Sequence, residues 1–400
     1  MGPAAATHAL GLTLALAVLG SALQAQDARP PGPPVIPIGV DLVRVDVVVT
    51  DRAGRHVADL RPEEVTIEED GRPRTIAAMR YVTTGLPAAP LPAAAAPSMP
   101  AAEEARAPTE PRSMVIVLDD VTFSAESRTR VPRVIGQIID ERAGPDMPVA
   151  IIRTGGGIAA GQDFTADKTL LRAVLSHLRP APGGTGGVRG DTMEAEQRVQ
   201  MTLQMLRNME ALVAQLAERP GRKTLLIVSE GMGLASNVDV EGVRGLDQLR
   251  RLTDAANRAG VTISTVEPSG LVSGLSGNSA SSHADPFTTS AMLRDQLNGQ
   301  LLNATAQRLS LRRGPEQLAA ETGGVALADS NDIRGAVERA WDDQDGYYLI
   351  GYEPEAVAAS SSDGESVEHH ITVRVKRKDL TVRARRVYYV RAAEPGPAVP

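Results

Sequence analysis

The stretch Met114-Val-Ile-Val-Leu-Asp-Asp-Val-Thr-Phe-Ser124 decides the fold of this chain. Its first five residues are all apolar, which is typical of a strand that is covered on both faces of a parallel sheet. Acidic and hydroxyl side chains follow at once, where such a strand ends. Ligands of open parallel sheets bind outside the carboxyl ends of the strands, so these side chains are candidates for binding.

The spacing of these polar residues is compatible with two frames. Counted from Asp119, the positions two and four residues further on carry valine and phenylalanine, which have no side-chain oxygen. Counted from Asp120, the same positions are Thr122 and Ser124, which do. The sequence leaves open which aspartate faces a binding crevice.

Three more apolar runs follow along the chain, and apolar residues recur at helical spacing between them, over 206–216 and 246–256. The runs are Pro148–Ile152, Thr224–Val228 and Val261–Val266. Strands that alternate with helices predict a doubly wound α/β domain with a mainly parallel sheet. We place this domain at residues 113–345.

Two segments with strand patterns flank the α/β domain, at residues 38–82 and 346–391. In the first, valines alternate with other residues from Val43 to Val49, and Asp70-Gly71 predicts a hairpin between Val65–Ile67 and Thr75–Met79. A small β unit of this kind is marginal alone, so the two segments are candidates to form one small β-sandwich around the inserted α/β domain.

The second segment contains one more expected strand and one more expected hairpin. Tyr347–Tyr352 has the composition of a strand. Ile371–Val375 and Leu380–Val390 are expected to form a hairpin around Lys378-Asp379. This hairpin carries most of the basic residues near the end of the chain.

The ends of the chain and one internal stretch predict no packed structure. Ala9–Ala22 is apolar and leads into Ser21-Ala-Leu-Gln-Ala25, which predicts a signal peptide at residues 1–25 and export to the periplasm or the exterior. No second apolar stretch is long enough to span a bilayer after cleavage. Residues 83–112 are rich in Ala and Pro and predict a linker, and residues 392–400 a disordered tail.

Composition restricts the function. With 42% hydrophobic and 23% charged residues in 400, the chain can bury a sizeable core, and with 2% aromatics that core must be aliphatic. A formal net charge of -7 disfavours a nucleic-acid partner. Cysteine is absent and histidine is limited to six positions, so neither disulfides nor a Ser/His/Asp or Cys/His set is evident. We expect no enzymatic activity.

Oxygen-bearing side chains recur where other strands of the α/β domain end or where loops precede its helices. Glu230 follows the third apolar run, and Thr185 lies in the loop Gly183-Gly-Thr-Gly-Gly187. Together with Asp119 and Asp120 they make a set of oxygen donors, which suits Mg²⁺, Ca²⁺ or Mn²⁺.

The order of these motifs resembles the von Willebrand factor A domain and its metal-ion-dependent adhesion site. Several stretches are also similar to a group of secreted A-domain-related proteins abundant in Acidobacteria, and the resemblance extends over nearly the whole mature chain. These stretches are Val45-Asp-Val-Val-Val-Thr-Asp51, Glu69-Asp-Gly71, Gln162-Asp-Phe-Thr-Ala-Asp167, Glu321-Thr-Gly-Gly324 and Tyr348-Leu-Ile-Gly-Tyr-Glu-Pro354.

The resemblance implies a degenerate metal site with a free coordination position for an acidic residue of a protein partner. Glu230 replaces the usual aspartate and Thr122 the usual first serine, and the alternative is that these side chains only cap helices and turns. The implied metal ligands are Asp119, Asp120, Thr122, Ser124, Thr185 and Glu230. The chain is thus expected to be a noncatalytic, exported protein-interaction or adhesion module.

Two other functions compete with this expectation. Seven basic residues on the expected C-terminal hairpin favour a structural or scaffolding envelope protein that contacts acidic partners, unless they merely protect a solvated strand face. They are Arg374, Lys376, Arg377, Lys378, Arg383, Arg385 and Arg386. A secreted hydrolase would rest only on export and a glycine-rich crevice.

Overall fold

A computed structural model describes most of the chain after residue 41. The described ranges are 42–83, 111–156, 163–178, 195–232, 240–270, 311–328, 330–354 and 367–390, with single residues 299, 302 and 309. The chain divides into two units, Met1–Asp41 and Leu42–Pro400, and the described residues all belong to the second. The expected signal peptide, the tail, almost all of the linker and Thr185 lie outside the described residues.

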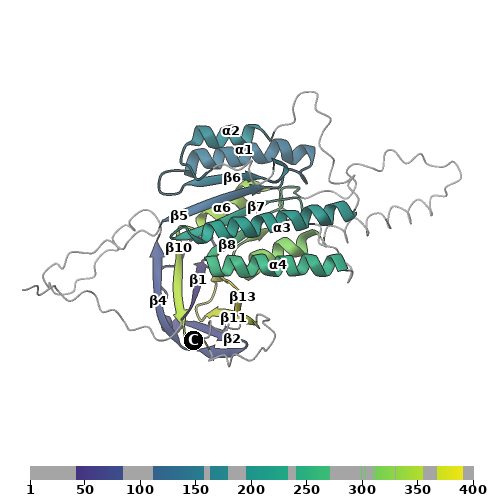
Figure 1. Ribbon diagram of the computed structural model, residues 1–400. Helices are drawn as coiled ribbons and strands as arrows, with labels where there is room; N and C mark the ends of the chain where they lie inside the picture. The colour runs from purple at the N-terminus through teal and green to yellow at the C-terminus, as the bar shows by residue number, and fades with distance from the viewer. Residues whose placement is uncertain are drawn as a thin grey trace, which may run out of the picture. The chain divides into compact units, whose positions relative to one another are not determined.

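A five-stranded parallel sheet forms the centre of the α/β part (Figure 1). Its order is β6-β5-β7-β8-β9, and every strand pair is parallel. The strands are β5 (Arg112–Leu118), β6 (Val149–Arg153), β7 (Arg222–Val228), β8 (Val261–Val266) and β9 (Ala326–Leu327). The predicted parallel sheet is therefore confirmed, with strands at the apolar runs.

Helices cover both faces of this sheet, as Figure 1 shows. On one face α1 (Ala125–Arg142), α2 (Lys168–Ser176) and α6 (Ile333–Asp342) bury aliphatic side chains against β5, β6 and β7. On the other face lie α3 (Ala195–Ala217), α4 (Val240–Ala259) and a helix over 311–322. The sheet lies between these two layers of helices, so both of its faces are buried. This is why its strands carry apolar residues on both sides.

Two four-stranded antiparallel sheets are built from the two flanking segments. One has the order β12-β1-β10-β4 and the other β13-β11-β2-β3, and each mixes strands from before and after the α/β part. The strands are β1 (Val43–Thr50), β2 (Val65–Glu69), β3 (Arg72–Arg74), β4 (Ile76–Thr83), β10 (Gly346–Tyr352), β11 (Val367–Val375), β12 (Thr381–Ala384) and β13 (Val387–Val390). Both sheets contribute to one apolar core, which contains Val47, Ile67, Ile350 and Ile371.

The hairpin expected around Lys378-Asp379 forms only in part, because its returning segment is divided into two strands that join different sheets. β11 pairs with β2 and β13, whereas β12 crosses to the other sheet and pairs with β1. Asp379 has a positive φ of 67°, and the turn there leads Val382 and Ala384 into the shared core. The chain gains more from covering that core than from a two-stranded hairpin.

The turn at Asp70-Gly71 is present, but the strand that follows it is Arg72–Arg74 and not the expected Thr75–Met79. It joins β2 to β3, where Glu69 pairs with Arg72. β4 belongs to the other sheet and pairs with β10. The sheet of β2 and β11 thus loses both β4 and β12, the strands expected to pair with them, to the sheet of β1 and β10.

The antiparallel sheets contact the α/β part at the amino end of its parallel sheet. The backbone N–H of Arg386 donates to the carbonyl of Glu321 at 3.2 Å, and Asn257 Nδ2 donates to the carbonyl of Val387 at 2.8 Å. Gly323 has a φ of +81° and lies so close that a Cβ would be 2.8 Å from the Arg385 nitrogen. This close approach requires glycine.

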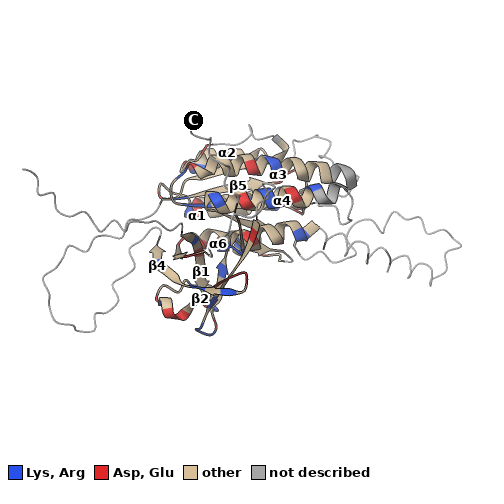
Figure 2. Ribbon diagram, turned by 60° about the horizontal axis from the view of Figure 1, so that its bottom comes forward, with Lys and Arg blue, Asp and Glu red and all other residues tan. Residues whose placement is uncertain are grey.

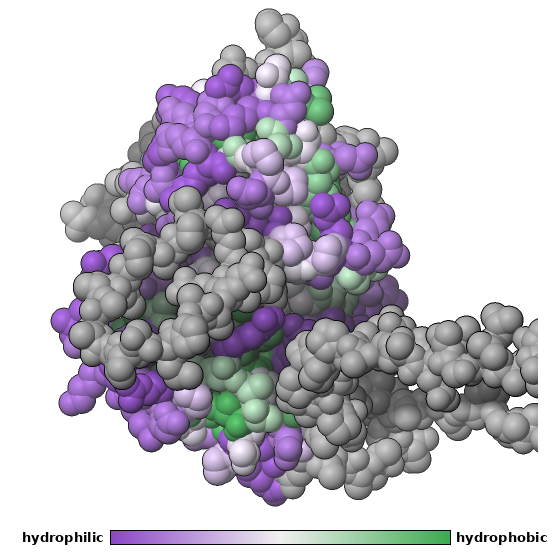
Figure 3. Space-filling model, turned by 90° about the vertical axis from the view of Figure 1, so that its left-hand side faces the viewer, coloured by the Kyte–Doolittle hydropathy of each residue, from purple (hydrophilic) through white to green (hydrophobic). Residues whose placement is uncertain are grey.

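The hydropathy of the surface (Figure 3) and of the described helices is mixed. On the face shown in Figure 3, hydrophilic and apolar residues are interspersed, as on most globular proteins. Within the described ranges, no helix has the length and apolar character needed to cross a bilayer.

Gly324→Ala tests the packing between the end of the 311–322 helix and β8. A Cβ at Gly324 would lie 2.0 Å from the carbonyl oxygen of Ile263, so the backbone must move. We expect a loss of about 2 kcal/mol in the free energy of unfolding, measured by urea denaturation. Gly144→Ala is the control, because a Cβ there meets nothing within 4 Å. Equal stability of the two variants would contradict the described packing.

Glu321→Gln tests a half-buried carboxylate beside the junction. Burial raises the pKa of Glu321, and the nearby Glu368 carboxylate acts in the same direction. A raised folded-state pKa stabilises the protein below the unfolded value, and this contribution is lost as the pH rises through the folded value. We therefore expect the melting temperature of the variant to exceed that of the parent at pH 8 more than at pH 4.

Glu316→Gln is the matched control, because Glu316 is exposed on the same helix. Its melting temperature should follow that of the parent at both pH values. The same pH dependence in both variants would show that burial of Glu321 is not the cause.

Candidate functional site

The candidate site lies where the winding direction of the parallel sheet reverses. β5 is followed by its neighbour β6 on one side, whereas β7, on the other side of β5, is followed by β8 further out. The crevice of such a sheet opens at the carboxyl ends of β5 and β7. Asp119 directly follows β5 and Ser229 directly follows β7, and the Ser229 hydroxyl donates to Asp119 Oδ2 at 2.7 Å.

Three hydroxyls surround the Asp119 carboxylate. Besides Ser229, Thr122 Oγ1 donates to Oδ2 at 2.8 Å, and Thr154 Oγ1 donates to Oδ1 at 2.8 Å. Asp119 is 4% exposed, and this burial raises the pKa of its carboxyl, against the hydrogen bonds that lower it. We call Asp119, Thr122, Thr154 and Ser229 the hydroxyl cluster.

Asp120 points to a different partner. Its Oδ2 accepts from Arg153 Nη2 at 2.7 Å and from Arg153 Nε at 3.0 Å, and its Oδ1 accepts from the Gly155 N–H at 2.7 Å. Asp119 is therefore the aspartate that binds the hydroxyls of neighbouring strand ends. The frame Asp120-x-Thr122-x-Ser124 does not form one cluster of contacts.

Ser124 and Glu230 form the rim of the site. Ser124 is the N-cap of α1, where its Oγ accepts from the Ser127 N–H at 3.2 Å. Glu230 accepts from the Ser124 N–H at 2.9 Å and from its hydroxyl at 2.7 Å. The Glu230 N–H lies 3.4 Å from Thr122 Oγ1, which connects the rim to the hydroxyl cluster.

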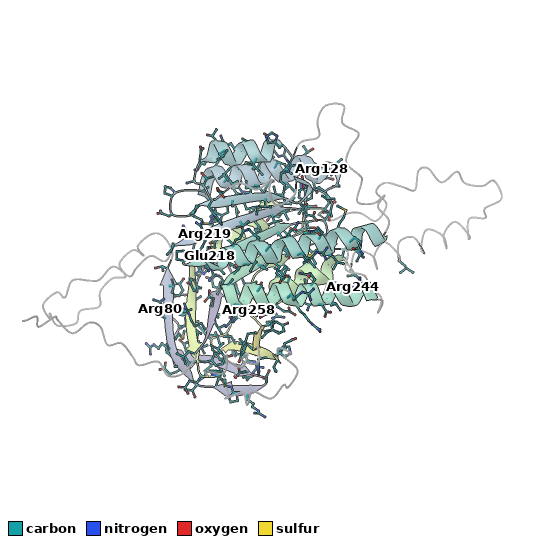
Figure 4. All side chains as sticks on the ribbon, viewed as in Figure 1. Arg80, Arg128, Glu218, Arg219, Arg244 and Arg258 are labelled. Carbon is teal, nitrogen blue, oxygen red and sulfur yellow. The ribbon has the colours of Figure 1, made fainter. Side chains whose placement is uncertain are left out.

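Phe123 stands where one frame would place a hydroxyl. Its ring is 2% exposed and belongs to the apolar core between the sheet and α1. Arg128 Nε donates to its carbonyl at 3.2 Å. In Figure 4, Arg128 and Arg219 lie at opposite ends of the parallel sheet, with Arg128 at the end of the candidate site. Phe123 thus fixes the turn between β5 and α1 by packing.

The structure unites only part of the predicted ligand set. Asp119 and Thr122 lie together, Ser124 and Glu230 form a contiguous rim, and Asp120 is bound to Arg153. Thr185 lies outside the described residues. Metal binding by the six residues stays a prediction.

Thr154, Arg153 and the hydroxyl of Ser229 are site residues that were not predicted from the sequence. Thr154 follows β6 directly, as Ser229 follows β7, so the rule that selected Asp119 would also have selected both. Arg153, the last residue of β6, lies opposite Leu118 in the register of β5 and β6. No pattern in the sequence indicates that its guanidinium reaches Asp120.

The chemistry of the donors fits a hard divalent cation at the hydroxyl cluster. All four side chains offer oxygen, and only Asp119 among them carries a carboxylate. In the described part of the chain, no three His, Cys, Asp or Glu residues are grouped closely enough to hold a metal ion. A cation here would therefore be bound by one central carboxylate, hydroxyls and water.

An apolar hollow of about 360 Å³, including its open mouth, adjoins Ser229. It lies between the ends of β7, β8 and β9 and the start of the 311–322 helix, and Met232 and Leu311 line it. Glu267 and Arg312 form an ion pair of 2.8 Å in its wall. The site thus joins a polar cluster to an apolar depression.

Most of the arginines that suggested a basic surface are engaged within the protein. Arg374 pairs with Glu68, Arg383 with Asp343, and Arg377 with Glu64 at 3.0 Å. Arg385 is half-buried, and its Nη1 donates to the carbonyl of Asn257 at 3.1 Å. Figure 2 likewise shows acidic and basic residues interspersed on the strands and helices. Lys376, Lys378 and Arg386 are exposed.

No protein-family model matches this chain, and no curated protein sequence matches it. Among solved structures it is similar to the crystal structure of the manganese-loaded TRAP protein of Plasmodium vivax, at 9% identity and a TM-score of 0.26. The similarity covers 69% of this chain and 92% of that chain. A TM-score of this size does not establish a shared fold. The structure by itself defines an α/β protein with a five-stranded parallel sheet and two antiparallel sheets.

Ser124→Ala tests the rim. The variant loses the cap of α1 and the hydroxyl bond to Glu230, so we expect a loss of about 1 kcal/mol in the free energy of unfolding. Thr129→Ala on the exposed face of α1 removes only a bond to the carbonyl one turn earlier and should change stability by less than about 0.5 kcal/mol. The free energies of unfolding of both variants are measured by chemical denaturation. Equal losses of stability would contradict the capping role of Ser124.

Proposed function

We propose that this protein is a noncatalytic interaction module of the von Willebrand factor A type that binds a protein partner at the carboxyl edge of its parallel sheet. A divalent cation at the hydroxyl cluster, Mg²⁺, Mn²⁺ or Ca²⁺, takes part in this binding. The observation that carries the proposal is the Asp119 carboxylate, which is buried and held by hydroxyls from three strand ends.

The A-type assignment is supported by the agreement of motif order with strand order. The β5 strand ends at Asp119, Ser124 caps the helix that follows, and Glu230 follows the adjacent strand β7. Antiparallel sheets formed from both flanks of the α/β part agree with the further stretches on which the resemblance rests.

The residues of this chain divide the binding task. Asp119 would supply the charge that holds the cation, and Thr122, Thr154 and Ser229 orient its carboxylate and supply further oxygens. A bound cation offers a positive coordination site to a carboxylate of the partner. Glu230 and Ser124 form the rim that such a carboxylate would meet first.

The noncatalytic assignment is supported by where three of the four described histidines are engaged. His56 lies 2.8 Å from the carbonyl of Asp342, and His369 lies 2.8 Å from Asp70. His370 lies 3.5 Å from Glu368. These contacts are at the antiparallel sheets, so none of these three rings is paired with Ser124 or Ser229 as a general base.

Export to the periplasm or exterior is proposed from the apolar run Ala9–Ala22 and the small residues that follow it. A scaffolding role through the basic C-terminal strands is less supported, because Arg374, Arg377 and Arg383 are neutralised by acids of the same chain. These pairs leave little excess charge there for an acidic partner.

Calorimetric titration of Mn²⁺, Mg²⁺ and Ca²⁺ tests the cation. We expect binding with a dissociation constant on the order of 10⁻⁴ to 10⁻³ M, the weak range of extracellular cation sites. Asp119→Asn should abolish it, because the amide removes the only negative charge of the hydroxyl cluster. Glu126→Gln, an exposed acid in the first turn of α1, should leave it unchanged.

Two results would count against the proposed cation. One is the absence of binding heat at millimolar ion with a folded protein. The other is equal binding by the Asp119→Asn and Glu126→Gln variants, which would place the ion elsewhere on the acidic surface.

A further inference from the structure

Two adjacent carboxylates are buried at the end of β5. Asp119 and Asp120 are each 4% exposed, and the hydroxyl of Thr154 lies 2.8 Å from Asp119 Oδ1 and 3.4 Å from Asp120 Oδ1. Two buried negative charges at this separation repel each other unless a positive charge compensates them. A positive charge at the end of β5 therefore stabilises the ionised pair.

Arg153 provides that positive charge from within the chain. Its Nε and Nη2 both donate to Asp120 Oδ2, while the Gly155 N–H holds Oδ1. The loop fits closely here, because a Cβ at Gly155 would lie 3.0 Å from Asp120 Oδ1. Both carboxylate oxygens of Asp120 are thus bound on the β6 side, by Arg153 and Gly155.

Solvent reaches the guanidinium from one side. The Arg153 side chain is 24% exposed, and it lines a hollow of about 360 Å³, open to solvent, together with Asn208 and Met209 of α3. The pair is therefore not sealed in the core, and removing the guanidinium opens the Asp120 carboxylate to water and ions.

We propose that Arg153 is a built-in cation that occupies Asp120 and thereby restricts the binding of a divalent ion to the single carboxylate of Asp119. Arg153 acts as a positioning residue, since it sets the affinity and charge of the site through Asp120. The inference rests on the proposed cation at the hydroxyl cluster and adds what regulates its strength. It predicts that this chain binds divalent ions more weakly than its two adjacent aspartates would allow.

The test compares four proteins: the full mature chain, Arg153→Gln, Arg153→Lys and the double variant Asp120→Asn/Arg153→Gln. Mn²⁺ binding is measured by calorimetry and by electron paramagnetic resonance of the free ion, and thermal unfolding is followed with and without Mn²⁺. Arg153→Gln should bind Mn²⁺ at least about tenfold more tightly than the parent, because a second carboxylate then faces the ion.

The other variants separate charge from packing. Arg153→Lys keeps the positive charge and should bind as weakly as the parent. The double variant lacks both charges and should return to the affinity of the parent, since only Asp119 remains. Mn²⁺ should raise the melting temperature of Arg153→Gln more than that of either control, by mass action on the folded state.

The possible outcomes distinguish this inference from the proposed function. If the parent binds Mn²⁺ and Arg153→Gln binds no more tightly, the inference is overturned and the proposed function stands. If the parent shows no binding and Arg153→Gln gains it, the inference stands and the cation of the proposed function is lost. If neither binds, or if Arg153→Gln does not fold even with Mn²⁺ while the double variant folds, the inference is overturned.

Discussion

The antiparallel pairing of β1 with β10 is the constraint on which the rest of the structure depends. Val43 lies opposite Tyr352 and Val47 opposite Tyr348, although the whole α/β part separates the two strands in sequence. β10 also receives β4 on its other edge. A single strand thus fixes both ends of the inserted segment, and the loop-closure entropy is offset by the shared apolar core.

Charged contacts extend this constraint to the amino end of the parallel sheet. Arg222, the first residue of β7, is 3% exposed, lies 3.6 Å from Asp46 and stacks 4.3 Å from the ring centre of Tyr347. Arg112, the first residue of β5, pairs with Asp345 at 2.5 Å. Such buried or half-buried pairs specify how elements fit rather than adding much net stability. They also leave the carboxyl ends of β5 and β7 free for a site.

The sequence predicts the elements of this fold better than their partners. The run Val261–Val266 is a strand with those bounds, because five of its six residues are β-branched and favour a strand. The pairing expected for the two hairpins of the flanking segments differs from the structure. Alternation of apolar and polar residues shows that a strand has a buried face, but it does not show which sheet the strand joins. After the turn at Asp379, with its left-handed φ, β12 joins the sheet of β1, and nothing in the pattern of valines around the turn differs from that of a hairpin.

The candidate site shows the same limit at the scale of one residue. Both aspartates follow the last residue of β5, and only Asp119 binds the hydroxyl at the end of β7. The choice is made by residues distant in sequence, since Arg153 draws Asp120 toward β6 while Ser229 binds Asp119 from β7. A motif search that requires hydroxyls at fixed positions misses Thr154 and Ser229, because strand ends that are neighbours in space supply the same oxygens. The order of the strands in the sheet therefore determines which side chains form such a site. The spacing of residues after a single strand is the weaker guide.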